Sequence, residues 1–340
     1  MLETRRELAV DGEGVVAVLA PAFPALGRTT VVGHQLVNGE RLAGSDVGQG
    51  GERLARSDIR GLLRASGLRP ALVGLELIRG EGERLRDAMR TMAQEADVLV
   101  CDAESDDDLR GVAAAAMALG RETVWAGSGG LARHLLQGAG LARGPLASRF
   151  GVRIGERVAG PALFVVGSGS AVSHEQVELL ASRSDTIVMK IPAEVLLGGE
   201  QSPEWHSCAL ELERALITGR DAAVMPDPEI RLESGQGLAL TNALGAMVRP
   251  LASRVGALVV TGGETARAVF EAWGVRRLRL MGEVEAGLPF SVIAGWDREI
   301  CAITKAGAFG GRESLLRCLE FLKDFDHGMA VDNARSKGPR

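Results

Sequence analysis

Several features that define common protein classes are missing from this sequence. It has no tyrosine, and aromatic residues make up only 4% of its 340 residues, so a tyrosine acid or base is excluded. Its four cysteines form no CxxC pair, which argues against a disulfide framework and a zinc–thiolate site. Their spacing is typical of reduced thiols in a cytoplasmic protein. They are Cys101, Cys208, Cys301 and Cys318.

Signals for a metal, a membrane or a nucleic acid are also absent. The five histidines show no HExxH-like spacing, so we expect no metal held by protein side chains alone. No run approaches the ~20 apolar residues of a membrane span, and the first residues lack the apolar segment of a signal peptide. A net charge of −5 argues against a nucleic-acid-binding face. We expect a cytoplasmic protein with a small-molecule partner; a homo-oligomer stays open.

Short apolar, β-branched runs alternate with longer amphipathic segments along the chain. We expect strands at 14–21, 71–77, 96–102, 122–128, 162–170, 185–192, 257–264, 277–283, 291–296 and 298–307. Helices are predicted within 57–67, 82–96 and 105–120, the last with Ser105 as its N-cap and acids in its first turn. This alternation predicts an α/β fold with two domains, each a largely parallel sheet flanked by helices.

A change of composition divides the chain. From about 138 the sequence is rich in Gly and Arg and loses its periodicity, which is typical of a connection between domains. We expect a first domain at 1–145, a connection at 146–160, a second domain at 161–325 and a flexible tail at 326–340.

Three loops of the second domain share one pattern: an apolar strand, a short loop of Gly, Ser or Thr, and an amphipathic helix. They are "GSGS" (167–170), "TGGET" (261–265) and "TKAGAFGG" (304–311). Such loops follow the carboxyl ends of strands, where α/β sheets bind ligands, and free N–H groups at helix starts suit phosphate. Ser173 and Gln176 have capping-box spacing, so the first of these helices is predicted to begin at Ser173.

Each loop taken singly is better explained by a tight turn. Three of them together, one with Lys305 at its mouth as a partner for phosphate, predict a nucleotide or sugar-phosphate site. None is a Walker motif, and "GSGSAV" lacks the third glycine of a dinucleotide fingerprint, which leaves an oxidoreductase unsupported. A fourth loop, "GSGG" (127–130), has the same form in the first domain and is open to both interpretations.

Two stretches of the first domain carry candidate polar residues. In "APAFPALGRTTVVGHQLVNG" the prolines and glycines interrupt a strand, and Arg28 is either a bidentate clamp for a carboxylate or a surface charge beside a rigid turn. Asp102 and Glu104 end a strand, where a helix cap explains them better than catalysis. No catalytic base is indicated.

These stretches, together with "VCDAESDDDLRGVA" and "GEVEAGLPFS", resemble the four-carbon acid sugar kinase family in order from about residue 17 to about 323. The resemblance implies that the first domain binds an acid sugar of the erythronate, threonate or 3-oxo-tetronate type, and that the second binds ATP. It implies magnesium, held by phosphates and water. The implied nucleotide contacts, with Lys305 beside them, are Ser168, Gly169, Ser170, Gly262, Gly263, Glu264, Thr265, Gly307 and Gly310.

The sequence departs from the family pattern in one respect. Family members open with an Asp-Asp-Leu-Thr-Gly-Ala-like motif and carry a Lys-x-Asp-Ser-Thr-Leu-Arg-Gly-Asn-like segment, and neither is present here. Three hypotheses follow: a start placed too far downstream, a kinase completed by a second chain, or a non-catalytic nucleotide-binding protein. We expect an ATP-dependent kinase that is inactive alone if those motifs are required.

Overall fold

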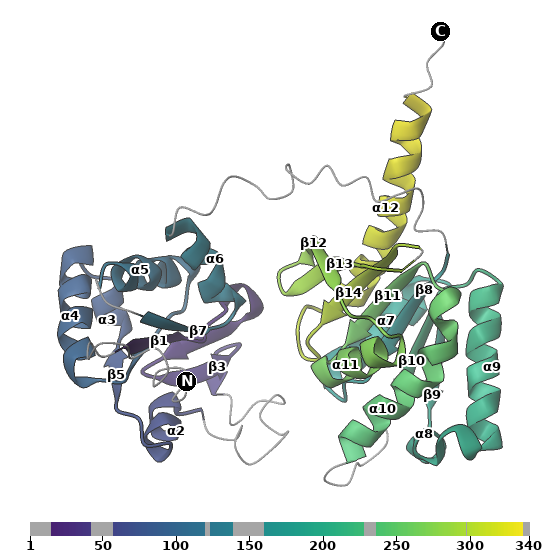
Figure 1. Ribbon diagram of the computed structural model, residues 1–340, viewed down its shortest axis with the longest axis horizontal. Coiled ribbons are helices and arrows are strands. Elements are labelled where there is room, and N and C mark those ends of the chain that lie inside the picture. Colours follow the sequence, from purple (N-terminus) through teal and green to yellow (C-terminus); the bar gives the residue numbers. More distant parts are fainter. Residues whose placement is uncertain are drawn as a thin grey trace. The chain divides into compact units, whose positions relative to one another are not determined.

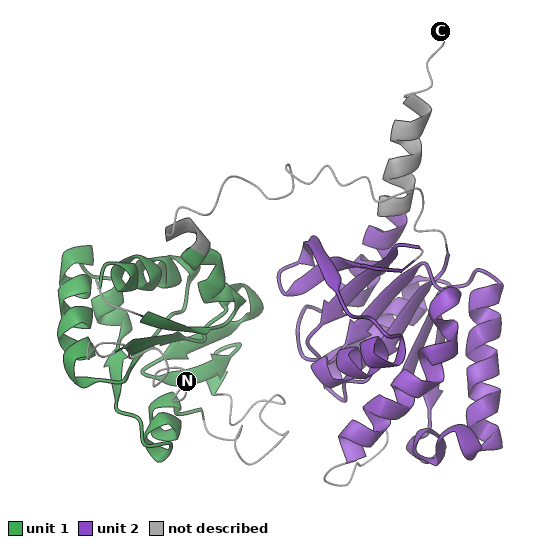
Figure 2. Cartoon of the chain, in the orientation of Figure 1, with its two compact units in different colours: residues 1–144 green, residues 145–340 purple. Residues whose placement is uncertain are grey.

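The computed structural model describes residues 15–41, 57–119, 123–138, 160–227, 236–296 and 298–335 (Figure 1). The chain divides into two compact units, residues 1–144 and 145–340 (Figure 2). Apart from Gly160, the connection predicted at 146–160 lies outside the described residues, and so does the end of the predicted tail, 336–340. Both units contain a largely parallel sheet flanked by helices, which confirms the predicted fold class.

The first unit is built on four parallel strands in the order β5-β6-β1-β7. The strands are β1 (Val16–Ala20), β5 (Pro70–Val73), β6 (Val98–Cys101) and β7 (Thr123–Gly127). Its helices are α2 (Ile59–Ala65), α3 (Leu75–Ile78), α4 (Gly82–Glu95), α5 (Asp106–Met117) and α6 (Gly129–Gly138). The core forms where Met89 of α4 and Leu109 of α5 pack on Val16 and Val18, since every second residue of a strand faces the same side.

One expected strand of this unit is partly wrong. The predicted strand at 71–77 ends at Val73, and Leu75–Ile78 forms the short helix α3 with Gly74 as its N-cap. A short apolar run has no periodicity that separates a strand from a buried helical turn, so the sequence could not locate this boundary.

An antiparallel three-stranded sheet follows β1, where the sequence indicated only an interrupted strand. Its strands are β2 (Arg28–Val31), β3 (His34–Val37) and β4 (Glu40–Arg41), preceded by the 3-10 turn η1 (Pro24–Leu26). The second hairpin turns at Asn38-Gly39, both with positive φ, as in a type I′ turn. Asn-Gly is the strongest short hairpin signal, so this turn could have been predicted from the sequence.

The first hairpin turns at Val32-Gly33, which also have positive φ (53° and 73°). A β-branched residue in this region is strained because its Cβ crowds the backbone. The buried Asp102 carboxylate holds the turn, because its two oxygens accept the N–H groups of Val32 and Gly33 at 2.8 Å each. Asp102 therefore caps a hairpin turn instead of the helix start that the sequence favoured.

The helix start itself is capped as predicted by Ser105, whose Oγ accepts the Asp108 N–H at 3.1 Å. Asp108 completes the capping box: one oxygen accepts the Ser105 N–H at 3.0 Å, and both oxygens accept the Arg79 guanidinium at 2.9 Å. Burial raises the pKa of the Asp108 carboxyl, but the hydrogen bonds from Arg79 and the backbone outweigh it and lower the pKa to about 2.

The second unit contains a seven-stranded sheet in the order β12-β13-β14-β11-β8-β10-β9, antiparallel only where β13 pairs with β12 and β14. The strands are β8 (Ala162–Val166), β9 (Ile187–Ile191), β10 (Ala222–Pro226), β11 (Ala257–Thr261), β12 (Leu278–Glu285), β13 (Leu288–Ile293) and β14 (Ile300–Lys305). The apolar run that forms β10 is only five residues long and did not predict a strand, although its first four residues are buried.

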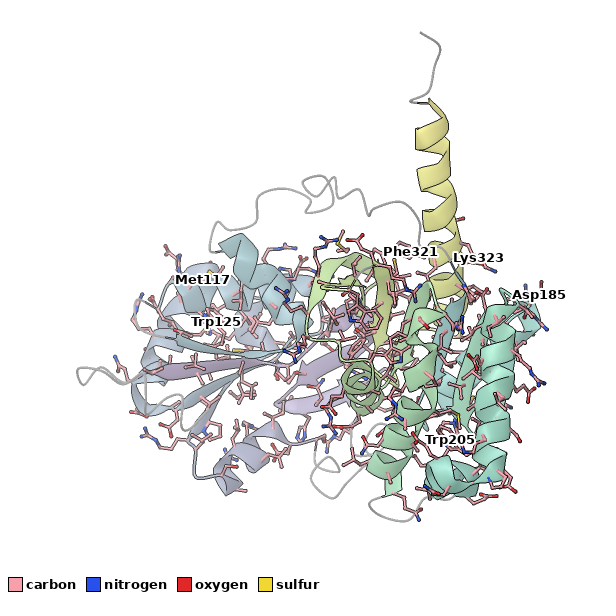
Figure 3. All side chains as sticks on the ribbon, turned by 45° about the vertical axis from the view of Figure 1, so that its right-hand side comes forward. Met117, Trp125, Asp185, Trp205, Phe321 and Lys323 are labelled. Carbon is pink, nitrogen blue, oxygen red and sulfur yellow. The ribbon has the colours of Figure 1, made fainter. Side chains whose placement is uncertain are left out.

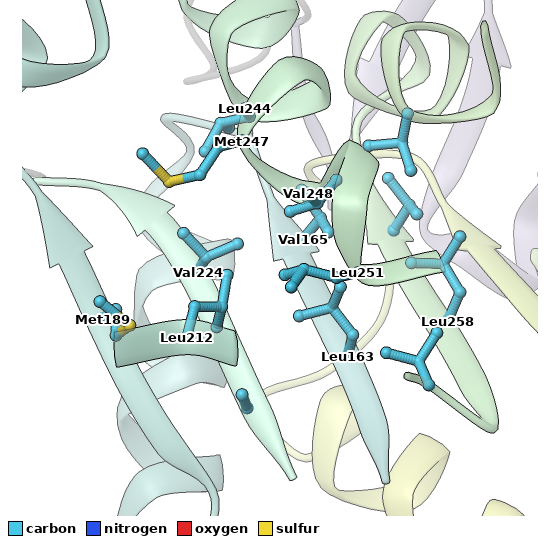
Figure 4. Close-up of a cluster of buried hydrophobic side chains, with 14 of the residues drawn as sticks. Leu163, Val165, Met189, Leu212, Val224, Leu244, Met247, Val248, Leu251 and Leu258 are labelled. Carbon is cyan, nitrogen blue, oxygen red and sulfur yellow. The ribbon is translucent and has the colours of Figure 1, made fainter. Parts of the chain in front are cut away.

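Helices cover both faces of this sheet. They are α7 (Ala171–Arg183), α8 (Ala193–Gly198), α9 (Pro203–Ile217), α10 (Gln236–Val248), α11 (Gly263–Ala272) and α12 (Ser314–Arg335), with 3-10 turns η5 (Gly199–Gln201) and η6 (Arg249–Ser253). On one face Leu163, Val165 and Val224 pack against Leu212 and Leu244 of α9 and α10 (Figure 4).

The opposite face of the sheet is covered by α7 and α12. There the ring of Phe321, on α12, meets the edge of the Phe290 ring with centroids 5.0 Å apart (Figure 3). No helix among the described residues is both long and apolar enough to span a membrane.

We expect Val32→Asn to stabilise the first hairpin by about 1 kcal/mol, since asparagine adopts positive φ more readily than valine. Amide hydrogen exchange of peptides covering residues 28–37 should slow about fivefold. Val32→Ala is the control, because its Cβ keeps the backbone crowding. Equal protection in the two variants would contradict the assignment of strain to Val32.

We expect Asp108→Asn to cost about 2 kcal/mol of local stability above pH 4, because the charged hydrogen bonds from Arg79 are lost. The folded pKa is depressed, so this contribution is complete above about pH 4 and lost as the pH falls toward about 2. Hydrogen exchange of peptides from α5 measures it as a function of pH. Asp107→Asn, at an exposed neighbouring acid, should leave the profile unchanged.

Candidate functional site

The ends of three parallel strands, β8, β11 and β14, lie side by side in the second unit. Their last residues are in register, with Thr261 opposite both Val166 and Lys305. Backbone hydrogen bonds continue past the strand ends: the Gly167 N–H donates to the Thr261 carbonyl at 3.3 Å, and the Gly262 N–H to the Lys305 carbonyl at 2.8 Å. The three loops that the sequence singled out therefore meet at one edge of the sheet.

This edge is also where the chain changes direction. The connection leaving β8 leads to β9 on one side of the sheet, whereas the one leaving β11 leads to β12, β13 and β14 on the other side. Ligands of α/β proteins commonly bind at such a switch point, beyond the carboxyl ends of the strands.

The first loop leads directly into α7. Ser170, not Ser173, is the N-cap: its Oγ accepts the Ser173 N–H at 3.2 Å, so the predicted helix start was one turn too late. Ser173 and Gln176 instead face the third loop. Ser173 Oγ donates to the Gly307 carbonyl at 2.8 Å, and Gln176 Nε2 donates to the Phe309 and Gly311 carbonyls at 3.2 and 2.8 Å.

Thr265 fills the space between the first two loops. It is 1% exposed, and a Cβ added at Gly167 would lie 2.0 Å from its Oγ1. Gly262, which begins α11, has φ 98°, a conformation that L side chains rarely adopt, and its Cβ would lie 3.1 Å from the same oxygen. Glycine is therefore required at Gly167 for the first two loops to approach each other, and at Gly262 for the backbone conformation before α11.

Lys305, at the end of β14, is 3% exposed and turns its side chain over its own loop. Its Nζ donates to the carbonyls of Ala306, Gly307 and Phe309 at 3.1, 2.7 and 3.0 Å. Burial lowers the pKa of this ammonium group to about 8, while Cys318 and Glu285 act in the opposite direction.

Four carbonyls of this loop point toward the protein interior. Those of residues 306, 307, 309 and 311 are the acceptors of Lys305, Ser173 or Gln176. Every peptide bond of the described chain is trans, so the N–H following each carbonyl points the opposite way. These N–H groups have no partner among the described residues; they belong to Gly307, Ala308, Gly310 and Arg312.

The other predicted residues lie in varied surroundings. Glu264 is exposed and pairs with Arg267 at 3.2 Å, in the first turn of α11. Gly169 and Gly263 have open space where a Cβ would be, whereas a Cβ at Gly310 would meet the Ser314 hydroxyl. In the first unit Arg28 is half-buried on β2, and burial lowers its pKa.

The fourth loop, at 127–130, is explained by packing within the first unit. Ser128 Oγ donates to the Ala22 carbonyl at 2.6 Å and accepts the Gly130 N–H at 3.0 Å. Side chains at Gly127 and Gly130 would collide with the carbonyls of Ala20 and Ala22. The tight-turn interpretation accounts for these residues.

Two buried polar atoms beside the three loops have no hydrogen-bond partner among the described residues. They are Thr261 Oγ1, at the carboxyl end of β11, and Gln176 Oε1 on α7. Elsewhere in the described chain, no three His, Cys, Asp or Glu side chains gather as a metal site would require. The donors at this edge are backbone N–H and hydroxyl groups, a set suited to phosphate oxygens.

Comparison with known domains matches both units. A model of a sugar-binding N-terminal domain matches residues 4–135, and a model of a nucleotide-binding C-terminal domain matches residues 163–315. The second match contains all three loops described above.

Curated proteins are similar over most of the chain. A D-threonate kinase of Cupriavidus necator is 36% identical over 307 residues, 88% of this chain and 72% of that protein. A D-threonate kinase of Bordetella bronchiseptica is 30% identical, over 92% and 72%. A 3-oxo-tetronate kinase of Methylobacterium radiotolerans is 29% identical, over 93% and 76%.

Two crystal structures share the fold. A Salmonella typhimurium protein aligns with a TM-score of 0.65 at 20% identity, covering 89% of this chain and 72% of that one. A Haemophilus influenzae protein aligns with a TM-score of 0.59 at 19% identity, covering 94% and 76%.

We expect Gly307→Ala to destabilise the third loop by about 2 kcal/mol, because its Cβ would lie 2.2 Å from Ser168 Oγ. Gly311→Ala is the matched control, since nothing lies within 4 Å of a Cβ there. Hydrogen exchange of peptides covering residues 302–316 measures the difference. The double variant Gly307→Ala/Ser168→Gly should recover part of the loss, and equal stability of the two single variants would contradict this packing.

Proposed function

The chain belongs to the four-carbon acid sugar kinase family, and from this premise we propose that it is an ATP-dependent kinase of a four-carbon sugar acid of the threonate, erythronate or 3-oxo-tetronate type. The reaction transfers the terminal phosphoryl group of ATP to a substrate hydroxyl and releases ADP. Which acid and which hydroxyl react is left to the experiment below.

One observation carries the assignment of the nucleotide site. The N–H groups of residues 307, 308 and 310, in the third loop, and of residue 312 just after it have no partner among the described residues and point outward beside the β8–β11 switch point. They lie within the segment similar to a nucleotide-binding domain. Amide groups in this arrangement bind the oxygens of a phosphate without any charged side chain.

The proposed nucleotide site is made of the three loops at this edge. In the first loop the hydroxyls of Ser168 and Ser170 form a hydrogen bond of 3.1 Å at the start of α7. A phosphate oxygen can replace this hydrogen bond and accept from the hydroxyls. In the second loop the N–H groups that open α11 are unused by the helix and add to the positive end of its dipole. We propose as nucleotide-site residues Ser168, Gly169, Ser170, Gly262, Gly263, Glu264, Thr265, Lys305, Gly307 and Gly310.

Magnesium is part of this proposal, held mainly by the phosphates and water, as is usual for this ion. When bound, ATP supplies the phosphoryl group and magnesium offsets its charge. The chain's own contribution is to bind and orient the phosphates with fixed dipoles, since phosphoryl transfer depends more on positioning and charge stabilisation than on covalent chemistry.

The sugar acid is assigned to the first unit, whose residues 4–135 are similar to a sugar-binding domain. We propose Arg28 as a partner of the substrate carboxylate. The partial burial that lowers its pKa would strengthen an ion pair with a carboxylate, because the guanidinium is already partly desolvated.

Calorimetric titration of the 340-residue chain with Mg·ATP, followed by ADP release with D-threonate, D-erythronate and 3-oxo-tetronate, tests the proposal. We expect binding and turnover with one of the three acids. Arg28→Met should raise the KM for that acid about tenfold or more while leaving the affinity for ATP within twofold, because a charge-assisted pair is lost only in the substrate site.

The other outcomes have distinct meanings. Binding of ATP without turnover on any of the acids would overturn the kinase assignment for this chain alone and favour a non-catalytic or partner-dependent nucleotide-binding protein. Absence of ATP binding would overturn the nucleotide site itself.

A further inference from the structure

We propose that Lys305 is a positioning residue of the nucleotide site: its ammonium group holds loop 306–311 from the protein side, so that the loop amides face the phosphates. In this role Lys305 acts through the backbone and does not contact the nucleotide. The inference rests on the proposed function, because it gives a role to one residue of that site.

The geometry of the ammonium group supports this role. An ammonium has three N–H donors, and the three carbonyls that Lys305 contacts, those of Ala306, Gly307 and Phe309, lie at 2.7 to 3.1 Å from Nζ. With the side chain 3% exposed, a phosphate contact would require breaking at least one of these hydrogen bonds.

Lys305 is the one described side chain that contacts all three of these carbonyls. The other donors differ between the three oxygens. The Gly307 carbonyl also accepts the hydroxyls of Ser173 and Ser170, at 2.8 and 3.3 Å. The Phe309 carbonyl also accepts Gln176 Nε2, and the Ala306 carbonyl accepts the Phe309 N–H. Removal of the ammonium would leave these carbonyls with neutral, weaker partners only. The peptide groups would then be less firmly held, and the outward orientation of their N–H groups would no longer be fixed.

The charge state fits this role. Because burial lowers the pKa of Lys305 only to about 8, the amine keeps its proton and all three donors at neutral pH. Glu285 is the neighbouring group that favours the charged form of the lysine, whereas the Cys318 thiol, whose pKa burial raises to about 12, stays neutral at this pH. The net positive charge behind the loop also favours an anion in front of it.

The test compares Lys305→Met and Lys305→Ala with Lys323→Met, which removes a lysine from α12 that pairs with Asp221 outside the three loops (Figure 3). Calorimetry with Mg·ATP and with adenosine measures affinity. We expect Lys305→Met to weaken ATP binding roughly tenfold or more, because charge-assisted hydrogen bonds are lost, while leaving adenosine binding within twofold. Lys323→Met should match the unaltered chain.

Two further measurements test the role of the ammonium group, and the second separates positioning from direct contact. Ethylammonium chloride should restore part of the ATP affinity of Lys305→Ala, since the free cation fits the space left between the three carbonyls. Ser173→Ala removes another donor to the Gly307 carbonyl, so its effect should be strongly non-additive with that of Lys305→Met. A lysine that contacted phosphate directly would give additive effects.

Each outcome decides the point. If the unaltered chain does not bind ATP, the proposed function fails before Lys305 is tested. If it binds ATP and Lys305→Met binds equally well, or if the effects of Lys305→Met and Ser173→Ala are additive, the positioning role is overturned. Should the Lys305 variants not fold, Ser173→Ala alone must still weaken ATP binding but not adenosine binding, and an unchanged ATP affinity would overturn the role.

Discussion

The site depends on one constraint, the parallel, in-register alignment of β8, β11 and β14. Because neighbouring parallel strands end at the same edge, three loops far apart in sequence, at 167–170, 261–265 and 304–311, meet there. The hydrogen bonds that continue past the strand ends, from Gly167 to Thr261 and from Gly262 to Lys305, then fix the first residue of two loops against its neighbour. In a sheet with a different strand order the same three loops would lie apart and would form no common site.

The glycines of these loops allow the loops to pack against one another, in addition to allowing a ligand to approach. Gly307 leaves room for Ser168, and Gly167 leaves room for Thr265, so the close approach that glycine permits is in both cases to another loop of the chain. The carbonyls of the third loop are held by Lys305, Ser173 and Gln176, and this inward pairing is what turns its N–H groups outward. The side chains that bind the carbonyl of each peptide group thus leave the N–H on its other side available to an anion.

The first unit uses a charged group in a similar way. Asp102 accepts both N–H groups of the Val32-Gly33 turn, as Lys305 donates to the carbonyls of its loop. In each case a buried charge at the end of a strand fixes a backbone conformation that local sequence preference would not maintain. Val32 retains its strained positive φ because the Asp102 carboxylate offsets the cost.

The sequence alone determined what depends on a few neighbouring residues: the alternation of strands and helices, the cap at Ser105 and the three loops. It also carried the family resemblance, through motifs in order along the chain. The tertiary structure decided which groups face each other. Gln176 had the spacing of a capping box yet pairs with carbonyls of residues 309 and 311, and Lys305 turns back to its own loop. The reason is physical: propensity acts over one or two turns of chain, whereas the partner of a buried polar group is set by packing between segments far apart in sequence.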